Sequence, residues 1–204
     1  MSALASFRTA ILALLSDASN AIFSNDNIDQ ALRWALSEYS TRRPLLRTYM
    51  LDVEISSCIH YLPDDFATRH ITKVELYNED PDSVIELTHY AYKRDEQWVV
   101  GTSTISAGEV LQITYSTIHT IDGLDSASGT TVPAEDEPLL HTGAAGRAAQ
   151  MRALDRIETI NMNKDVVAAY RQLGAEFLNY FAGHLTINPG VTISPLPSFP
   201  EIKF

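Results

Sequence analysis

The sequence predicts an α+β protein: a helical bundle of about four helices with an inserted small antiparallel β-sheet domain and an extended C-terminal tail. Three observations predict this fold. Apolar residues recur with helical spacing near both ends of the chain, they alternate with polar residues in the middle, and the last stretch mixes apolar residues with prolines. The expected divisions are a bundle from residues 1–46 and 134–185, a β insertion at 47–121, a flexible linker at 122–133 and a tail at 186–204.

Two helices are predicted before the β insertion. The first covers about residues 3–15 and the second about residues 27–39, after N-cap candidates at 24–26. Each carries an apolar stripe at helical spacing, formed by Phe7, Ile11, Leu14 and Leu15 and then by Ile28, Ala31, Leu32, Ala35, Leu36 and Tyr39. Pro44 cannot continue a helix, so the second helix is expected to stop by Arg42 or Arg43.

Strands are predicted where the apolar period changes to two. The first, at residues 47–55, alternates Tyr49, Leu51, Val53 and Ile55 with polar positions. Later strands are expected at 71–77, at 84–92 as one strand or a pair, at 97–100 with Gly101 as its end, and at 110–117. Pro63 suits the start of a short helical turn after a strand end, and residues 78–83 have the composition of a turn.

Two further helices complete the predicted bundle. Residues 134–158 form an Ala-rich helix whose periodic positions are Leu140, Ala144, Arg147, Ala148, Met151 and Leu154. Gly143 and Gly146 weaken its first half but allow another backbone to approach closely. The last helix covers residues 164–185, and its predicted buried face comprises Val166, Tyr170, Leu173, Phe177, Phe181 and Leu185.

The tail combines two features that rarely occur together. Its prolines, Pro189, Pro195, Pro197 and Pro200, exclude a helix and a central strand. Its apolar residues are Ile187, Val191, Ile193, Leu196, Phe199, Ile202 and Phe204, a content that disordered tails normally lack. Burying one such side chain contributes roughly 1.5–3 kcal/mol, against about 1–2 kcal/mol per residue for ordering the backbone. The tail therefore needs a surface, either on its own domain or, as we favour, on a neighbouring subunit or another protein.

Charge and cysteine content narrow the function classes. The net charge is −11, and only Arg42, Arg43 and Arg47 form a notable basic cluster, so tight gripping of DNA phosphates is not expected. The single cysteine, Cys58, permits no intrachain disulfide and is predicted to be a small buried apolar residue in a reducing compartment. The apolar runs are too short to span a membrane, and the N-terminal residues do not have the pattern of a secretory signal.

The sequence contains no recognisable catalytic, cofactor or metal motif, so we expect a non-enzymatic protein without cofactor or metal. The histidines lack metal-ligand spacing and are expected at the surface or hydrogen-bonded: His60, His70, His89, His119, His141 and His184. Asp64-Asp65 and Glu135-Asp136-Glu137 are predicted to begin helices, with a loose cation site as the alternative for the second run. Core or cross-strand packing is expected for Tyr90, Tyr92, Trp98 and Tyr115.

An ordered series of short motifs gives the chain a family resemblance. The motifs are Leu15-Ser16-Asp17, Ser24-Asn25-Asp26 before residues 28–35, Glu38-Tyr39-Ser40, Arg43-Pro44, residues 61–66, Val74-Glu75, residues 132–140 and the helix at 170–185. In this order they resemble the head-to-tail adaptor proteins of tailed bacteriophages, also called connector or head-completion proteins, over roughly residues 1–185.

The resemblance implies a virion structural protein, made in the host cytoplasm, that forms a ring of about twelve copies beneath the portal at the capsid vertex. Its expected partners are the portal ring, a downstream neck or tail protein and other copies of itself. DNA would pass through the lumen without sequence-specific binding, and no membrane is involved. Family members commonly reach the portal through terminal segments, so the seven apolar tail residues are predicted portal contacts. The alternatives are a tail-completion or minor capsid protein, or a small ligand-binding module or enzyme with its site in the β insertion.

Overall fold

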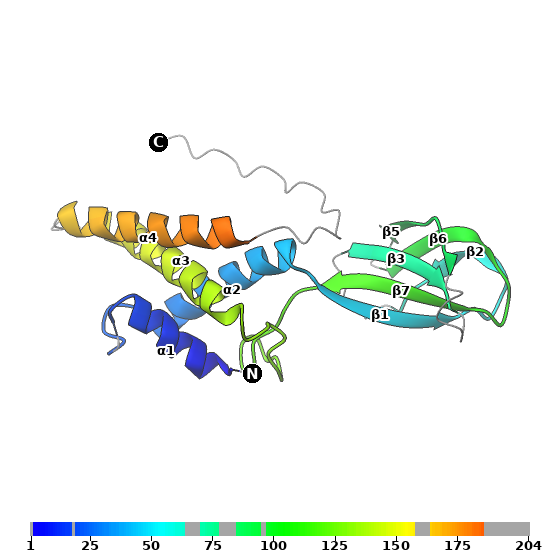
Figure 1. Ribbon diagram of the computed structural model, residues 1–204, viewed down its shortest axis with the longest axis horizontal. Coiled ribbons are helices and arrows are strands. Elements are labelled where there is room, and N and C mark those ends of the chain that lie inside the picture. Colours follow the sequence, from blue (N-terminus) through cyan, green and yellow to red (C-terminus); the bar gives the residue numbers. More distant parts are fainter. Residues whose placement is uncertain are drawn as a thin grey trace. The chain divides into compact units, whose positions relative to one another are not determined.

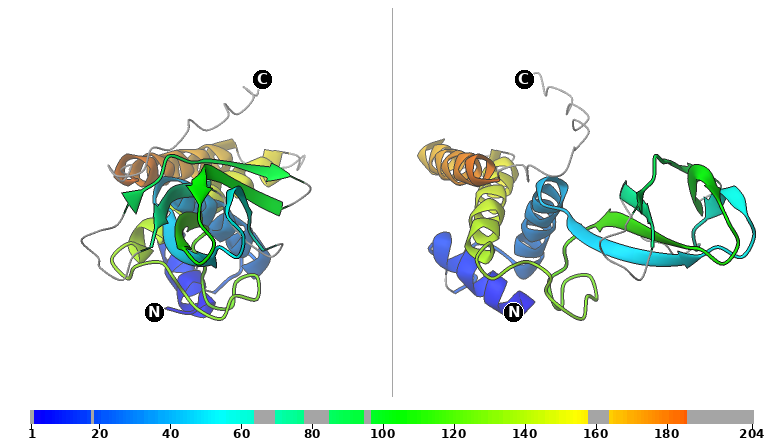
Figure 2. Two further views of the ribbon diagram at one scale, coloured as in Figure 1. Left: turned by 90° about the vertical axis from the view of Figure 1, so that its right-hand side faces the viewer. Right: turned by 45° about the vertical axis from the view of Figure 1, so that its right-hand side comes forward.

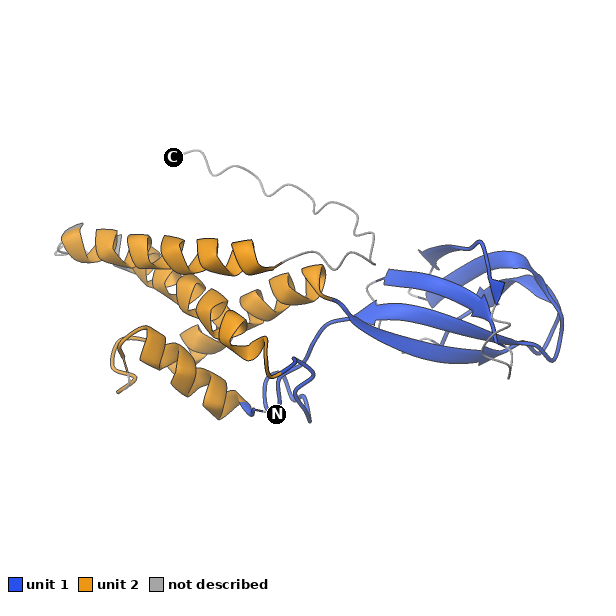
Figure 3. Cartoon of the chain, in the orientation of Figure 1, with its two compact units in different colours: residues 1–3, 44–133 blue, residues 4–43, 134–204 orange. Residues whose placement is uncertain are grey.

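The computed structural model describes residues 2–17, 19–63, 70–77, 85–94, 97–157 and 164–185 (Figure 1). Within this part of the chain the predicted α+β class is confirmed, with four helices and antiparallel strands inserted between the second and third. The chain divides into two compact units (Figure 3). The helical unit comprises residues 4–43 and 134–204, and the β unit comprises residues 1–3 and 44–133.

The helical unit contains α1 (Leu4–Leu14), α2 (Asn25–Arg42), α3 (Glu137–Ile157) and α4 (Lys164–His184). The predicted stripe of α2 is confirmed, because all six of its residues are buried. The Ser24 hydroxyl caps this helix by accepting a hydrogen bond from the Asn27 amide at 3.2 Å, which satisfies one of the free N–H groups of the first turn. The helix ends at Arg42, as Pro44 predicted.

Glycines set the close approach of α3 and α4, which cross in both views of Figure 2. A Cβ atom added to Gly146 would lie 3.1 Å from the Gly174 carbonyl oxygen, and one added to Gly174 would lie 3.0 Å from the Gly146 carbonyl oxygen. A Cβ on Gly143 would meet the Phe181 ring at 2.7 Å. The prediction that these glycines allow another backbone to approach closely is therefore confirmed for Gly146, whereas Gly143 accommodates the Phe181 side chain instead.

Polar side chains hold α1 and the loop after it. The Asp17 carboxylate accepts hydrogen bonds from three consecutive backbone amides, those of Ala21, Ile22 and Phe23, at 2.8–3.0 Å. Arg8 on α1 makes a bidentate pair with Asp29 on α2, with distances of 2.8 and 2.6 Å. The two contacts fix the turn between these helices and their relative position.

The stripes of the other helices are wider than the surfaces that cover them. Leu14, Leu154 and Val166 were predicted to be buried, but they are exposed, Leu154 by 55% and Val166 by 41%. Tyr170, Leu173 and Phe177 are only half-buried. The reason is that α4 packs mainly against α3, so only a narrow row of its side chains has a neighbour.

The β unit contains two sheets in place of the single small sheet that was predicted. The strands are β1 (Leu45–Asp52), β2 (Ser57–Tyr61), β3 (His70–Leu76), β4 (Ile85–Glu86), β5 (Tyr90–Arg94), β6 (Gln97–Ile105) and β7 (Val110–Thr117). Their orders are β1-β7-β3-β4 and β2-β6-β5, and all pairs are antiparallel. Both sheets contribute to one core cluster, which consists of Val53, Leu62, Ile71, Val74, Val100, Ile105, Leu111 and Ile113.

Two details of the β unit correct the predictions. The strand expected to end at Gly101 continues through it, because Gly101 is paired with Ile59 of β2 on one side and with Tyr90 of β5 on the other. Ile55 lies beyond the end of β1 and is 78% exposed, so it does not continue the buried alternation. Residues 64–66 and 78–83, predicted as a helical turn and a turn, lie outside the described residues.

The segment after β7, expected to include a flexible linker at 122–133, is hydrogen-bonded within the β unit. The Thr130 hydroxyl accepts from the Asp122 amide at 2.9 Å and donates to the Ser2 carbonyl oxygen at 2.6 Å. The Thr131 hydroxyl accepts from the Thr120 amide at 2.8 Å. Two apolar side chains of the segment, Leu124 and Val132, are buried. The Thr130 and Thr131 hydroxyls thus satisfy backbone groups of this segment and hold it in place. The Gly- and Ser-rich composition had predicted a flexible linker instead.

Candidate functional site

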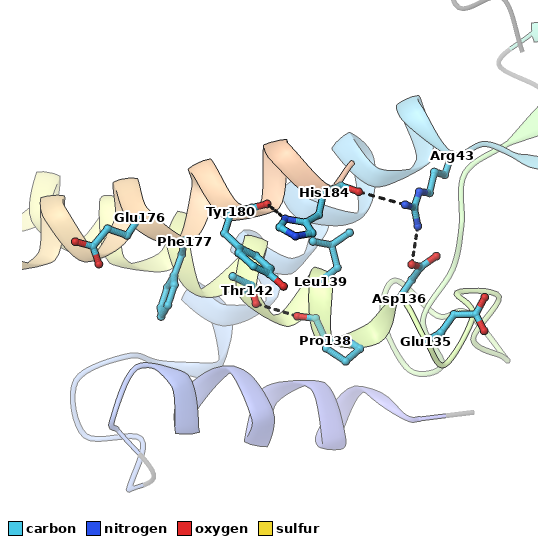
Figure 4. Close-up of a pocket in the computed structure, with 10 residues that line it drawn as sticks. All are labelled: Arg43, Glu135, Asp136, Pro138, Leu139, Thr142, Glu176, Phe177, Tyr180 and His184. Atoms are coloured by element: carbon cyan, nitrogen blue, oxygen red, sulfur yellow. Dashed lines mark hydrogen bonds and ion pairs between the residues drawn. The ribbon is translucent and has the colours of Figure 1, made fainter. Parts of the chain in front are cut away.

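The main polar cluster of the helical unit joins residues from three helices (Figure 4). Asp136, just before α3, accepts hydrogen bonds from the Tyr39 hydroxyl at 2.5 Å and from the Arg43 guanidinium at 2.6 Å. Arg43 also donates to the carbonyl oxygen of His184, at the end of α4, at 3.2 Å. The ends of α2 and α4 and the start of α3 are therefore held together by one carboxylate and one guanidinium.

The ionisation of this cluster favours a structural role. The pKa of Tyr39 is raised, first by burial and then by the hydrogen bond to Asp136, so its hydroxyl remains a donor. The hydrogen bond to Asp136 also raises the pKa of Arg43, which stays cationic. The protonated phenol and the guanidinium both act as hydrogen-bond donors to the Asp136 carboxylate. The cluster therefore fixes helix ends.

An open groove of about 590 Å³ lies beside the cluster. Its floor and walls include the Tyr180 and His184 rings, stacked with centroids 4.0 Å apart, and the side chain of Phe177. Figure 4 shows these rings projecting from α4, with Glu135 and Asp136 across from them at the start of α3. The groove is thus lined both by aromatic rings and by charged side chains, including Arg43, Glu135 and Glu176.

Two histidines have a buried ring nitrogen. His60 still makes a hydrogen bond with the backbone of Ser57, as expected, whereas His141 departs from the expectation of a surface or hydrogen-bonded position. The Nε2 atoms of His60 and His141 are buried and have no hydrogen-bond partner among the described residues. Burial lowers the pKa of both, so both are neutral at pH 7. The edge-to-face contact of His141 with Phe7, with centroids 4.9 Å apart, shows the imidazole acting as a packing group between α1 and α3.

Other predicted positions have mixed outcomes. Cys58 was predicted to be buried, but it is exposed; it lies where the pairing of β2 with β6 shifts register between Ser57 and Ile59, so regular alternation does not fix the side to which it points. The acidic run at 135–137 does begin a helix, and the Asp136 carbonyl accepts from the Leu139 and Leu140 amides. Within the described residues, no group of three or more His, Cys, Asp or Glu side chains is arranged to hold a metal ion.

The predicted aromatic positions fall into two classes. Trp98 and Tyr115 pack against the core of the β unit, as predicted. Tyr90 and Tyr92 are exposed and stack on each other, with centroids 6.2 Å apart and an angle of 10° between the rings. The Tyr90 ring also lies over Gly101 of β6, which is the cross-strand packing that was predicted as the alternative to a core position. The sequence did not distinguish the two classes, because the position of a residue on one or the other face depends on strand register.

The predicted docking residues of the tail, from Ile187 to Phe204, lie outside the described residues, as do Asp64 and Asp65. The basic cluster at 42–47 is not a uniform cationic surface, since Arg43 is committed to Asp136 and His184. The residues that the sequence reasoning missed are Tyr39 and Asp136 as a pair, separated by 97 positions. Their only signal was the resemblance, whose motifs contain both.

None of the helices in the described residues is both long and apolar enough for a membrane span. No family model matches the chain, and no curated protein matches it.

Proposed function

We propose that this protein is a structural head-to-tail connector of a tailed bacteriophage. In this proposal, copies form a ring beneath the portal, extend the DNA channel and link the capsid vertex to the neck or tail. The portal ring and a downstream neck or tail protein are its partners, and the seven apolar residues of the tail, Ile187 to Phe204, provide portal contacts.

The observation that carries the proposal is the plan of the chain. Two helices, an inserted β unit and two further helices follow one another in the order that the family resemblance implies. Two of the motifs behind that resemblance, Arg43-Pro44 and the acidic run at 135–137, meet in the ion pair of Arg43 with Asp136. The motifs are therefore parts of one packing arrangement, which supports treating their order as meaningful.

Charge supports the same proposal. With a net charge of −11, the protein repels DNA phosphates at long range, and the basic cluster at 42–47 is partly neutralised by Asp136. A channel component needs DNA to pass without being held. Groups that bind DNA tightly neutralise several phosphates with Lys and Arg, which this chain does not offer as a cluster.

Portal binding by a truncated protein tests the proposal. Full-length protein should co-sediment with isolated portal rings, and protein lacking residues 188–204 should keep its far-ultraviolet circular dichroism and melting temperature but lose portal binding. If truncated protein binds as well as full-length protein, the portal role of the tail is wrong. If neither binds, the connector assignment is wrong, and a tail-completion or minor capsid protein becomes the better assignment. Electron microscopy of the assembled neck would then locate the chain.

A further inference from the structure

The outer surface of the three-stranded sheet carries a cluster of exposed apolar side chains. The register places Ile59 and Tyr90 on either side of Gly101, because each is paired with this residue of the central strand β6. In the next row along the strands, Tyr61 and Tyr92 are both paired with Val99. Residues in one cross-strand row project from the same face of a sheet. We call the surface formed by Ile59, Tyr61, Tyr90 and Tyr92 the tyrosine face.

The tyrosine face points away from the core of the β unit. The residues that alternate with it contribute to the core cluster, namely Leu62 after β2, Ala91 in β5, and Trp98 and Val100 in β6. The sheet, labelled β2, β6 and β5 in Figure 1, thus has one side on the shared core, and its other side carries the tyrosine face around the buried Val99.

The four side chains remain exposed although they are large and apolar. The exposed fractions are 39% for Ile59, 53% for Tyr61, 57% for Tyr90 and 41% for Tyr92. The parallel stack of Tyr90 and Tyr92 and the position of the Tyr90 ring over Gly101 give a surface of ring faces. Clustered exposed apolar groups mark interaction sites, and tyrosine is enriched in them.

The C-terminal segment has the complementary chemistry. Residues 186–204 include four prolines and seven large apolar residues, and the run Pro195-Leu196-Pro197-Ser198-Phe199-Pro200 favours the extended polyproline conformation. Such segments bind aromatic-lined surfaces at low entropic cost, since proline already restricts the free chain. The segment carries only Glu201 and Lys203 as charged side chains, so the net charge of −11 does not repel it.

A second copy of the chain is the source of this segment that best fits the proposed ring. A segment and a face that differ from each other produce head-to-tail contacts, in which every copy still has one free segment and one free face. Repeated contacts of this kind form a ring when the rotation between successive copies closes, and an open filament when it does not. At roughly 3.1 Å per residue in the polyproline conformation, a segment of nineteen residues can span up to about 60 Å.

We propose that, in the free protein before any contact with a portal, residues 186–204 of one copy dock on the tyrosine face of a second copy. The choice of a second copy as the source rests on the proposed ring, whereas the match between segment and face does not.

Two complementary variants test this proposal without a portal. The first, Y61S/Y92S, keeps the tail and loses the face; the second lacks residues 188–204 and keeps the face. Tyr90 is left unchanged because its ring covers Gly101. In analytical ultracentrifugation, full-length protein should self-associate beyond a dimer as concentration rises, and each variant alone should be monomeric. A mixture of the two should form a heterodimer.

A peptide assay provides the direct measurement. A labelled peptide of residues 186–204 should bind the truncated protein, and binding should weaken by about tenfold or more when the protein carries Y61S/Y92S or the peptide carries P195A/P197A/F199S. The peptide change cannot act by unfolding the protein. The matched control is Y77S, which removes an exposed tyrosine after β3, on the other sheet, and should leave peptide affinity unchanged.

Different results overturn the docking of the segment on the tyrosine face and the choice of a second copy as its source. A peptide that does not bind, or that binds Y61S/Y92S protein as tightly as the parent, overturns the proposal. Full-length protein that stays monomeric at all concentrations, while the two variants associate, shows that the segment docks on its own chain and overturns the second copy. None of these results depends on portal co-sedimentation, which tests the connector function separately.

Discussion

Gly174 in the helical unit and Gly101 in the β unit both lie beneath another part of the chain, but different atoms cover them. A Cβ on Gly174 would lie 3.0 Å from a backbone oxygen, that of Gly146, on a helix that cannot shift alone. A Cβ on Gly101 would meet the outer atoms of the Tyr90 ring at 2.0–2.4 Å, and this exposed ring can rotate away. The same residue type therefore fixes a backbone crossing in one unit and accommodates a movable side chain in the other.

The two units also differ in the interactions that stabilise them. The helical unit depends on specific pairs, such as Arg8 with Asp29 and Arg43 with Asp136, which determine where helices meet. The β unit depends on one shared apolar core and keeps large ring faces on its outside. This contrast agrees with our proposal, in which the helical unit acts as a frame and the β unit presents the surface that meets another chain.

The largest effect is expected for Gly174→Leu. The new side chain cannot fit between α4 and the Gly146 backbone, so the two helices must separate, at a cost of about 3 kcal/mol in the free energy of unfolding. Urea denaturation followed by circular dichroism measures this. The control is Gly183→Ala on the same helix, where a Cβ meets nothing within 4 Å and helix propensity should raise stability by up to about 1 kcal/mol. Equal effects of the two changes would contradict a close crossing.

Asp136→Ala should have the second largest effect. It leaves the Tyr39 hydroxyl and the Arg43 guanidinium without their acceptor, and a hydrogen bond to a charged group contributes about 1.5–3 kcal/mol. We expect a loss of about 2 kcal/mol in the free energy of unfolding, because both partners retain some access to water. Glu135→Ala, an adjacent exposed carboxylate, should change stability by less than about 0.5 kcal/mol. Comparable losses in both variants would show that Asp136 is not the anchor.

Acid should reveal the contribution of Asp17. Hydrogen bonds from the Phe23, Ile22 and Ala21 amides lower the pKa of its carboxyl in the folded protein. In the unfolded chain the pKa of an Asp carboxyl is about 3.9. Between these two pKa values the folded protein therefore binds fewer protons than the unfolded chain. This stabilisation is fully present at neutral pH and is lost as pH falls below about 4. Unfolding free energies at pH 7 and pH 3 should therefore differ less in Asp17→Asn than in the parent protein. An identical pH dependence would show that Asp17 is not preferentially ionised in the folded state.

Gly101→Ala should have the smallest effect, a loss of about 1 kcal/mol or less in the free energy of unfolding. This is expected although a Cβ on Gly101 would lie closer to its nearest neighbour, at 2.0 Å, than a Cβ on Gly174 would. The Tyr90 ring would rotate into solvent and give up its stack on Tyr92. Nuclear magnetic resonance should report this as a change in the Tyr92 ring shifts with an unchanged core. A loss as large as that of Gly174→Leu would remove the distinction between frame and surface.

The parts of this fold that depend on nearby residues were predictable. The α2 stripe, its cap at Ser24 and its end at Arg42 all follow from neighbours within a few positions. The exposure of Leu154 and Val166 was not predictable, because periodicity shows which side of a helix is apolar but not which helix covers it. The same applies to the split into two sheets, since pairing and register are properties of distant segments.

The candidate sites were not predictable, because they too depend on contacts between distant segments. The resemblance contained Tyr39, Arg43 and Asp136 but gave no reason for them to meet, since their contacts span more than 90 positions. The tyrosine face was invisible for a related reason. Tyr90 and Tyr92 look the same in sequence as Trp98 and Tyr115, and only the register of β5 on β6 separates outward rings from core rings.

The pairing of β1 with β7 begins at Leu45 opposite Thr117. The first residue of β1 and the last residue of β7 are therefore neighbours, with their Cα atoms about 5 Å apart. For protein engineering, this pair of strands is a suitable site for inserting another domain. The strands beyond it could be replaced by a fluorescent protein, an affinity tag or a β domain from another protein, provided the substitute also begins and ends side by side. The same property would allow the β unit to be exchanged in evolution while the helices that precede and follow it in the sequence keep their residues.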